Sequence, residues 1–228
     1  MTTRNRNTTV VTIAAPALTY FLTRAITLSA LLMLFGTAVH AATFHPISSI
    51  TSRTAATDLF PAIRMIEGAG VGFDVNAPHD RTGTLRWLTK DLGGPGSDYF
   101  NPTPDPAPRL VLDLGSNVSL SEISVWVYGA GAGALSINEG SVSDFNLQFA
   151  TAAEGTAGFG SSITFNPTYR AALDPLPRQS FPFGQDVIAR YVEFTPLNNH
   201  FGGPDSGGDR VGLGEIAFEN APVPAPST

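Results

Sequence analysis

Apolar residues in this chain recur in short runs with a period of two, and this spacing limits the possible folds more than any other feature. Alternate residues of a β-strand share one face, so each run predicts a strand with one buried face. The alternating sets are Leu110, Leu112 and Leu114; Phe145, Leu147 and Phe149; Ile163 and Phe165; Val192 and Phe194; Ile216 and Phe218. The 23 glycines and 18 prolines supply turns between such runs. We therefore predict an all-β fold, a single β-sandwich of jelly-roll architecture.

Helical periodicity is weak by comparison. After residue 42 there is no amphipathic helix of convincing length, and only Leu59–Ile66 predicts a short helical turn. Trp126 lies in the middle of a predicted strand and is expected in the core. Asp113 and Glu193 alternate with apolar residues, so we expect them to face solvent or to serve as turn partners.

The first 41 residues have the pattern of a secretory signal peptide. Arginines at positions 4, 6 and 24 precede the apolar run 25–35, and the segment ends on Val39-His-Ala41. The run is shorter than the roughly 20 apolar residues that a membrane span requires. We expect cleavage near Ala41, with an uncleaved N-terminal anchor as the alternative. The domain is then expected at 42–220, followed by a Pro-rich tail at 221–228.

Charge and cysteine content exclude several kinds of partner. The chain has 19 acidic and 13 basic residues, and removal of the signal peptide would take away three arginines and no acid. A domain this acidic predicts no binding to nucleic acid and no attraction to anionic membranes, and we expect no membrane insertion of the mature chain. The absence of cysteine favours an exported bacterial protein over a disulfide-stabilised one. It also excludes thiolate metal sites.

Four stretches carry a resemblance to a known family. They are 112–115 (Leu-Asp-Leu-Gly), 122–128 (Glu-Ile-Ser-Val-Trp-Val-Tyr), 189–194 (Ala-Arg-Tyr-Val-Glu-Phe) and 210–218 (Arg-Val-Gly-Leu-Gly-Glu-Ile-Ala-Phe). Together they resemble the discoidin type of galactose-binding-like jelly roll, over roughly residues 43–219. The resemblance implies a buried Trp87 and a non-catalytic module that recognises carbohydrate at the cell surface or in extracellular matrix.

A structural calcium ion is a further expectation. Calcium prefers six to eight oxygen ligands, and residues 67–84 are rich in carboxylate, amide and hydroxyl oxygens. The resemblance implies that this loop closes on calcium and that a glutamate at the start of the last strand completes the site. The candidate ligands are Glu67, Asp74, Asp80 and Glu215. In the alternative, Glu67 and Glu215 hydrogen-bond to loop amides without a metal.

Sugar recognition requires an aromatic platform and polar side chains that reach hydroxyl groups from neighbouring loops. The candidate ligand-binding residues on predicted loops are His79, Tyr99, His200, Phe201, Asp209 and Arg210. The densest cluster is the loop before the last predicted strand, where 198–201 is followed by Asp209 and Arg210. For Tyr99 and Phe201 the alternative is simple packing within the loops.

Catalytic patterns are weak. Asp205-Ser-Gly-Gly208 resembles the nucleophile loop of trypsin-like proteases, but the only histidine in a matching context, His40, lies in the predicted signal peptide. The remaining histidines are widely spaced, which argues against a transition-metal site. Two carboxylates meeting in a cleft would make a small glycan-active hydrolase, which stays open as an unfavoured alternative. We predict that the protein is not an enzyme.

Two further alternatives concern partners and location. The chain could instead be a structural or adhesion component of a matrix, acting through protein contacts without a sugar site. Residues 222–226 (Pro-Val-Pro-Ala-Pro) resemble the opening of a PEP-CTERM sorting signal, with Ala225 where that motif has glutamate. The tail is thus either a degenerate signal or only a Pro-rich end. In each case we expect a secreted or cell-surface protein.

Overall fold

The structure, a computed structural model, describes residues 44–53, 58–66, 86–90, 99–100, 108–127, 140–173, 178–200 and 210–222. All of them belong to one compact unit, residues 42–228. The predicted signal peptide, and all but the first two residues of the predicted tail, lie outside the described residues, so both stay predictions. Among the described residues, no helix is long and apolar enough to span a membrane.

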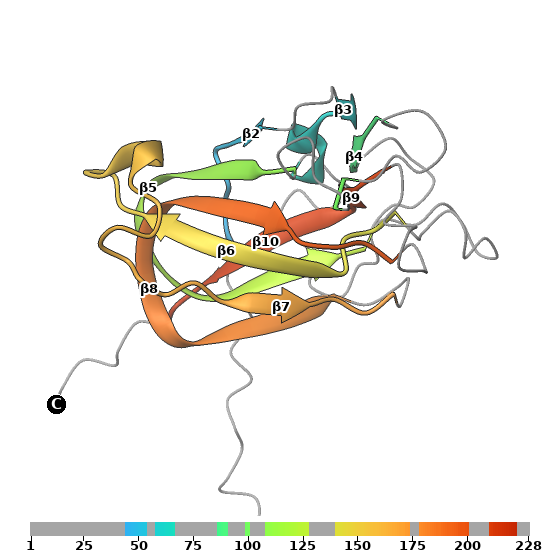
Figure 1. The fold of residues 1–228 in the computed structure, drawn as a ribbon. Helices are drawn as coiled ribbons and strands as arrows, with labels where there is room; N and C mark the ends of the chain where they lie inside the picture. The colour runs from blue at the N-terminus through green and yellow to red at the C-terminus, as the bar shows by residue number, and fades with distance from the viewer. Residues whose placement is uncertain are drawn as a thin grey trace, which may run out of the picture. The chain divides into compact units, whose positions relative to one another are not determined.

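Antiparallel strands form two sheets (Figure 1). The larger sheet has the order β1-β10-β5-β8-β6-β7, with β2 also paired to β5, and the smaller has the order β3-β4-β9. The strands are β1 (Phe44–His45), β2 (Ser49–Ser52), β3 (Asp58–Phe60), β4 (Trp87–Thr89), β5 (Leu110–Trp126), β6 (Asp144–Ala150), β7 (Thr168–Arg170), β8 (Gln179–Pro196), β9 (Gly212–Leu213) and β10 (Glu215–Asn220). Two short 3-10 turns occur among the described residues, η1 (Ala62–Met65) and η2 (Gly155–Ala157).

The long strands β5 and β8 bend and thereby create the two layers of the sandwich. The first part of β5 pairs with β2 and the last part of β8, whereas its second part pairs with β10 and the first part of β8. Pairing is interrupted between Asp113 and Val118, where Gly115 has a φ of 82°, a conformation that glycine adopts without strain. Figure 1 shows both strands curving at the left-hand end. The predicted all-β jelly-roll sandwich is therefore confirmed.

Aromatic side chains from the two layers meet in the core. Phe145 of β6 lies 5.4 Å from Phe181 of β8, and Phe149 of β6 lies 5.5 Å from Phe183 of β8, measured between ring centroids. Both pairs have the edge-to-face geometry that aromatic rings favour. Phe145 and Phe149 are fully buried, as their alternation with polar residues predicts. The alternating leucines of β5 are buried as well.

Both tryptophans lie in the core, as expected. Trp126 is 2% exposed and Trp87 is completely buried. The Trp87 indole donates a hydrogen bond to Asp58 Oδ1 at 3.1 Å. Burial raises the pKa of Asp58, and the hydrogen bonds from Trp87 and Ser52 oppose that increase. The indole of Trp87 thus pins β4 to β3 in the smaller sheet.

Three local expectations differ from the structure. The helical turn expected over Leu59–Ile66 begins only after Pro61, because residues 58–60 pair with β4 as a strand. Residues 163–165 form no strand and instead lie in an irregular segment between η2 and β7. Glu193 is 5% exposed, although its sequence position predicts solvent or a turn, and its carboxylate is 3.7 Å from the Arg109 guanidinium.

Asp113 has the expected role of a turn partner. Its carboxylate accepts a hydrogen bond from the Gly115 backbone N–H at 2.8 Å and a two-pronged pair from the Arg190 guanidinium at 2.9 and 3.0 Å. The hydrogen bond from Arg190 is the main reason that the pKa of Asp113 is lowered. The interaction therefore joins the bend of β5 to β8.

Candidate functional site

The polar cluster around His200 lies where β6 begins and β8 and β7 end, on the right in Figure 1. We call it the His200 end and define it by residues 141–144, 170–171, 197–200 and 210. Backbone hydrogen bonds hold 141–144 against 197–200 as a short ribbon: His200 N–H donates to Ser141 O at 3.1 Å, and Ser143 N–H donates to Asn198 O at 2.9 Å. The side chains of this end are therefore carried by backbone that is already paired.

Asn199 links the ribbon to the segment that precedes β9. Its side chain is 4% exposed, and its amide donates to Arg210 O at 3.0 Å. The Ser143 hydroxyl lies 3.0 Å from Asn199 O. The sequence grouped 198–201 with Asp209 and Arg210, and the structure brings the described members of that group together through Asn199. Arg210 itself is exposed.

His200 is the most distinctive side chain of this end. It is half-buried, and its Nε2 atom is fully buried with no hydrogen-bond partner. Burial lowers the pKa of His200, while a backbone hydrogen bond with Ala171 opposes the shift, and Arg170 and Asp144 act on it in opposite directions. The imidazole is therefore neutral at pH 7 and offers one unsatisfied ring nitrogen, which is costly in a buried position unless a partner supplies the hydrogen bond.

Charged groups flank this imidazole. The Arg170 guanidinium, 76% exposed, lies 3.6 Å from the Asp144 carboxylate. Sequence reasoning missed both residues, together with Ser143. They are 30 and 56 residues from His200 in the chain, and only the pairing of β6 with β7 and β8 brings them near it. No motif at positions 143–144 or 170 marks them in advance.

The structure corrects the expectation for Tyr99. Its side chain is 3% exposed, within the hydrophobic core, and its hydroxyl donates to Lys90 O at 2.5 Å. A sugar platform needs an exposed ring face, so Tyr99 acts as a packing residue, the alternative that its loop position also allowed. His79, Phe201 and Asp209 lie outside the described residues.

The candidate calcium ligands are only partly within the described residues. Glu215, the first residue of β10, is 6% exposed and stands opposite Trp126 in the sheet. Glu67, Asp74 and Asp80 lie outside the described residues. Within the ranges that the structure describes, no group of three or more His, Cys, Asp or Glu side chains could hold a metal. A buried carboxylate oxygen at Glu215 fits the ligand preference of calcium, and the rest of the site stays a prediction.

No family model matches the chain, and no curated protein matches it. Among solved structures, it is similar to a truncated AlyQ with CBM32 and alginate lyase domains (17% identity, TM-score 0.49), covering 82% of this chain and 36% of that one. It is also similar to the family 32 CBM of C. perfringens NanJ in complex with galactose (15% identity, TM-score 0.45), covering 79% of this chain and 100% of that one. A third similar structure is the lectin domain of lectinolysin complexed with Lewis B antigen (14% identity, TM-score 0.48), covering 80% of this chain and 100% of that one.

These are similarities in the arrangement of strands. The chain spans about a third of the AlyQ chain and essentially all of the NanJ and lectinolysin domains.

Proposed function

We propose that this protein is an exported, non-catalytic carbohydrate-binding module that holds its glycan at the His200 end. The observation that carries the proposal is the buried, unpartnered Nε2 of a neutral His200. A sugar hydroxyl can both donate and accept a hydrogen bond, so it would satisfy this nitrogen in either tautomer once the atoms that cover it move aside on binding. Binding would thereby remove the cost of leaving a buried polar atom unpaired.

The surroundings of His200 support a sugar rather than an ion. Arg170 and Asp144, the charged groups that act on the His200 imidazole, are paired with each other, so this pair offers both hydrogen-bond donors and acceptors. Asn199 and Ser143 fix the backbone beneath it. A site held by paired backbone loses little conformational entropy when it binds, which favours recognition by a shallow surface.

Export and calcium belong to the same proposal. Residues 1–41 would direct secretion, and the module would act at the cell surface or in extracellular matrix of a bacterium. Glu215, together with Glu67, Asp74 and Asp80, would hold a structural calcium that stiffens the loops. If calcium is bound, a chelator should lower the melting temperature of the purified protein, because a ligand selective for the folded state stabilises it.

The test of the sugar site is a binding series on the purified protein. We would measure affinity by calorimetry against a polysaccharide panel that includes galactose-containing glycans, for the wild type, for His200→Ala and for the control Ser180→Ala on an exposed position of β8. We expect His200→Ala to weaken binding by about tenfold or more, the cost of one lost hydrogen bond in a desolvated site, and Ser180→Ala to leave it unchanged.

Two results would decide against the proposal. Equal affinity of His200→Ala and wild type would remove the His200 end as the sugar site. A wild-type protein that binds no glycan, yet responds to calcium in its melting temperature, would favour the structural or adhesion role through protein contacts.

A further inference from the structure

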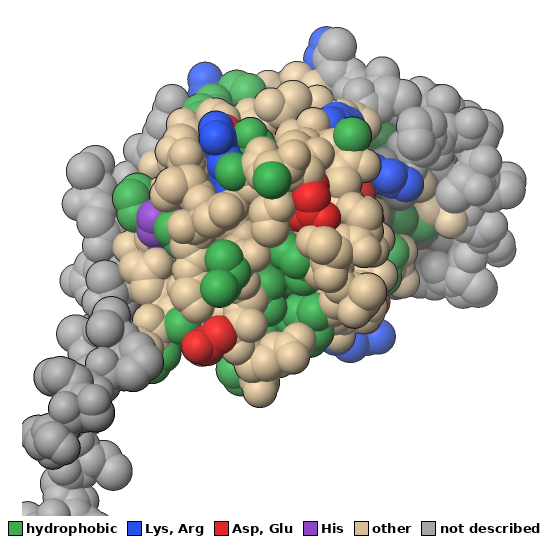
Figure 2. Space-filling view, turned by 90° about the vertical axis from the view of Figure 1, so that its left-hand side faces the viewer, with side chains coloured by type: hydrophobic (Ala, Val, Ile, Leu, Met, Phe, Trp, Pro, Cys, Tyr) green, Lys and Arg blue, Asp and Glu red, His purple; other side chains and the backbone are tan. Residues whose placement is uncertain are grey.

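A hollow of about 620 Å³ lies at the opposite end of the sandwich from His200, where β8 bends. We call it the bulge groove. Eight residues line it, from two segments: Ser162, Ile163, Thr164 and Phe165, and Gln185, Asp186, Val187 and Ile188. Its volume is within the range of small-molecule sites, roughly 300–1,000 Å³. This end faces the viewer in Figure 2, where hydrophobic side chains gather near the middle of the face, with acidic and basic side chains around them.

One wall is a bulge in β8. Leu120 of β5 is opposite Val187 and Glu122 is opposite Pro182, so residues 183–186 of β8 stand against the single residue 121 of β5. Gly184 has a φ of 72°, the left-handed conformation that lets the strand turn outward here. Bulges commonly re-aim side chains, and this one exposes Gln185 and Asp186 at the rim of the groove.

The other wall is an irregular segment held in place by Glu154. Its carboxylate accepts hydrogen bonds from Thr151 N–H and Thr151 Oγ1, both at 2.8 Å, and from Ser162 N–H at 3.0 Å. Ala152 N–H donates to Asn117 Oδ1 at 2.8 Å, which ties the segment to the bend of β5. The wall that carries residues 162–165 is therefore built without regular secondary structure but with satisfied hydrogen bonds.

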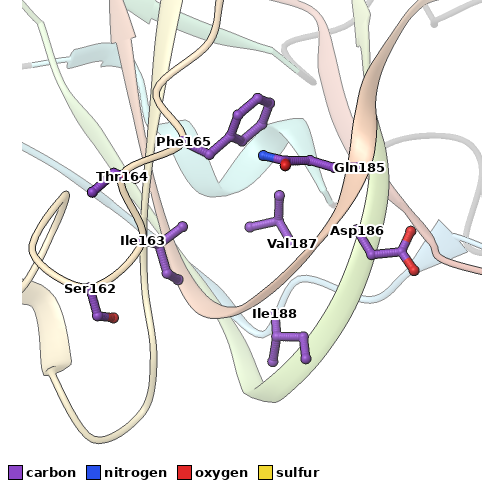
Figure 3. A pocket seen from close by; sticks show the side chains of 8 residues that line it. All are labelled: Ser162, Ile163, Thr164, Phe165, Gln185, Asp186, Val187 and Ile188. Carbon is purple, nitrogen blue, oxygen red and sulfur yellow. The ribbon is translucent and has the colours of Figure 1, made fainter.

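The floor is apolar and supported from below. Phe165 stacks on the buried Phe149 at 5.9 Å and lies edge-on to Phe183 at 5.8 Å, measured between ring centroids. Phe165 and Ile163 stay partly exposed, whereas Val187 is 3% exposed. Figure 3 shows Ile163 and Val187 pointing toward each other and the Gln185 amide turned toward Phe165, with the Asp186 carboxylate turned outward.

The lining has the chemistry of a sugar subsite. It joins an apolar floor to two hydroxyls, one amide and one carboxylate, and none of the eight lining residues is basic. A pyranose has an apolar C–H face and a rim of hydroxyls, which match such a floor and rim. A uronate or sulfated sugar would meet Asp186 with no compensating cation among the eight lining residues, and like charges repel. We propose that the bulge groove is a second carbohydrate site, specific for a neutral sugar residue.

This site is separate from the His200 end, so the proposal extends the function given above to two-site binding. Each end of the sandwich would hold a different sugar residue, and one molecule could then join two glycan chains. Where both glycan chains belong to one matrix, the second binding event becomes intramolecular and raises overall avidity without any new contact.

The test is a site-resolved titration by NMR of the ¹⁵N-labelled protein. The probes are neutral galacto-, gluco- and manno-oligosaccharides and, for comparison, an oligo-uronate. The variants are wild type, Gln185→Ala/Asp186→Ala, His200→Ala and the control Ser180→Ala, with melting temperatures confirming that each is folded. Exposed positions 185 and 186 can lose their side chains without opening the core.

We expect a neutral oligosaccharide to shift the amides of 162–165 and 185–188 in wild type, Ser180→Ala and His200→Ala. The double substitution should weaken that response about tenfold while leaving the response at 198–200 intact. The second site is rejected, and the proposed function kept, if neutral sugars shift only the amides near His200. It is also rejected if the oligo-uronate shifts the groove as strongly as neutral sugars do. If neither end responds to any glycan, both proposals fail.

Discussion

The two ends of the sandwich are built by different means. At the bulge groove, aromatic packing from below and the hydrogen bonds of Glu154 hold an irregular segment in place; half of the eight lining residues are apolar and none is basic. At the His200 end, a backbone ribbon carries a neutral histidine beside an ion pair, and one buried nitrogen has no partner. The comparison teaches that one sheet can present a pre-packed platform at one end and an unsatisfied polar group at the other.

The largest expected effect comes from the ring beneath the groove. Phe149→Ala would remove a fully buried ring that contacts both Phe165 and Phe183, and we expect a loss of about 3–5 kcal/mol in the free energy of unfolding. Denaturant unfolding measures it. A loss below about 1 kcal/mol would mean that packing does not hold the groove end in place. The contrast drawn above between the two ends would then be wrong.

A smaller effect is expected at the bulge itself. Gly184→Val would force a β-branched residue into a left-handed conformation, at a cost of about 1–2 kcal/mol, although no atom lies within 4 Å of the added Cβ. Gly184→Asn is the matched control, because asparagine tolerates this conformation better. Equal stability of the two variants in denaturant would show that backbone strain does not shape the bulge.

The titration of His200 should make the folded protein less stable in mild acid. Because burial lowers the pKa of His200 in the folded state, the unfolded state binds more protons below pH 6.5, and stability should fall as the pH drops through that value. Melting temperatures at pH 7.5 and pH 5.5 test this, with His200→Gln as the comparison. The wild type should lose more than the variant; an identical decrease in both would assign the titration elsewhere.

The local stability of the groove end should decrease only in stronger acid. Hydrogen bonds from Ser162 and Thr151 lower the pKa of Glu154 from 4.5 to about 2, so its contribution is complete above pH 4.5 and is lost as the pH falls toward 2. Glu154→Gln should speed amide hydrogen exchange in residues 151–162 at pH 7 while leaving the global melting temperature nearly unchanged. Unaltered exchange in that segment would show that the carboxylate does not brace the wall.

The fold was predictable because its signals are local. Alternation at 110–114 and 145–149 marks strands with one buried face, and those leucines and phenylalanines are buried. The same alternation failed at 163–165, where Ile163 and Phe165 line a groove instead of pairing in a sheet. Two apolar residues cannot distinguish a strand from a loop wall, because either can bury every second side chain.

The candidate site was predictable only in part. His200 and Arg210 were grouped from their loop composition, and Asn199 joins their segments in the structure, while their role in binding stays a prediction. Tyr99 was a candidate sugar platform in the sequence, and only the folded chain shows that its ring is enclosed. Asp144 and Arg170 were missed because nothing in their own segments indicates a neighbour on another strand.

Local sequence signals settle the class of fold, since side-chain alternation and turn residues act over a few positions and need no distant partner. Tertiary structure alone decided which polar groups became neighbours and which became buried. Glu193 illustrates this, because only the pairing of β8 with β5 and β6 buries its carboxylate near Arg109. The bulge groove illustrates it too: its two walls are about 20 residues apart in the chain and meet only because β8 bends back over the aromatic core. Contacts of that kind depend on the register of long strands, which no short stretch of sequence encodes.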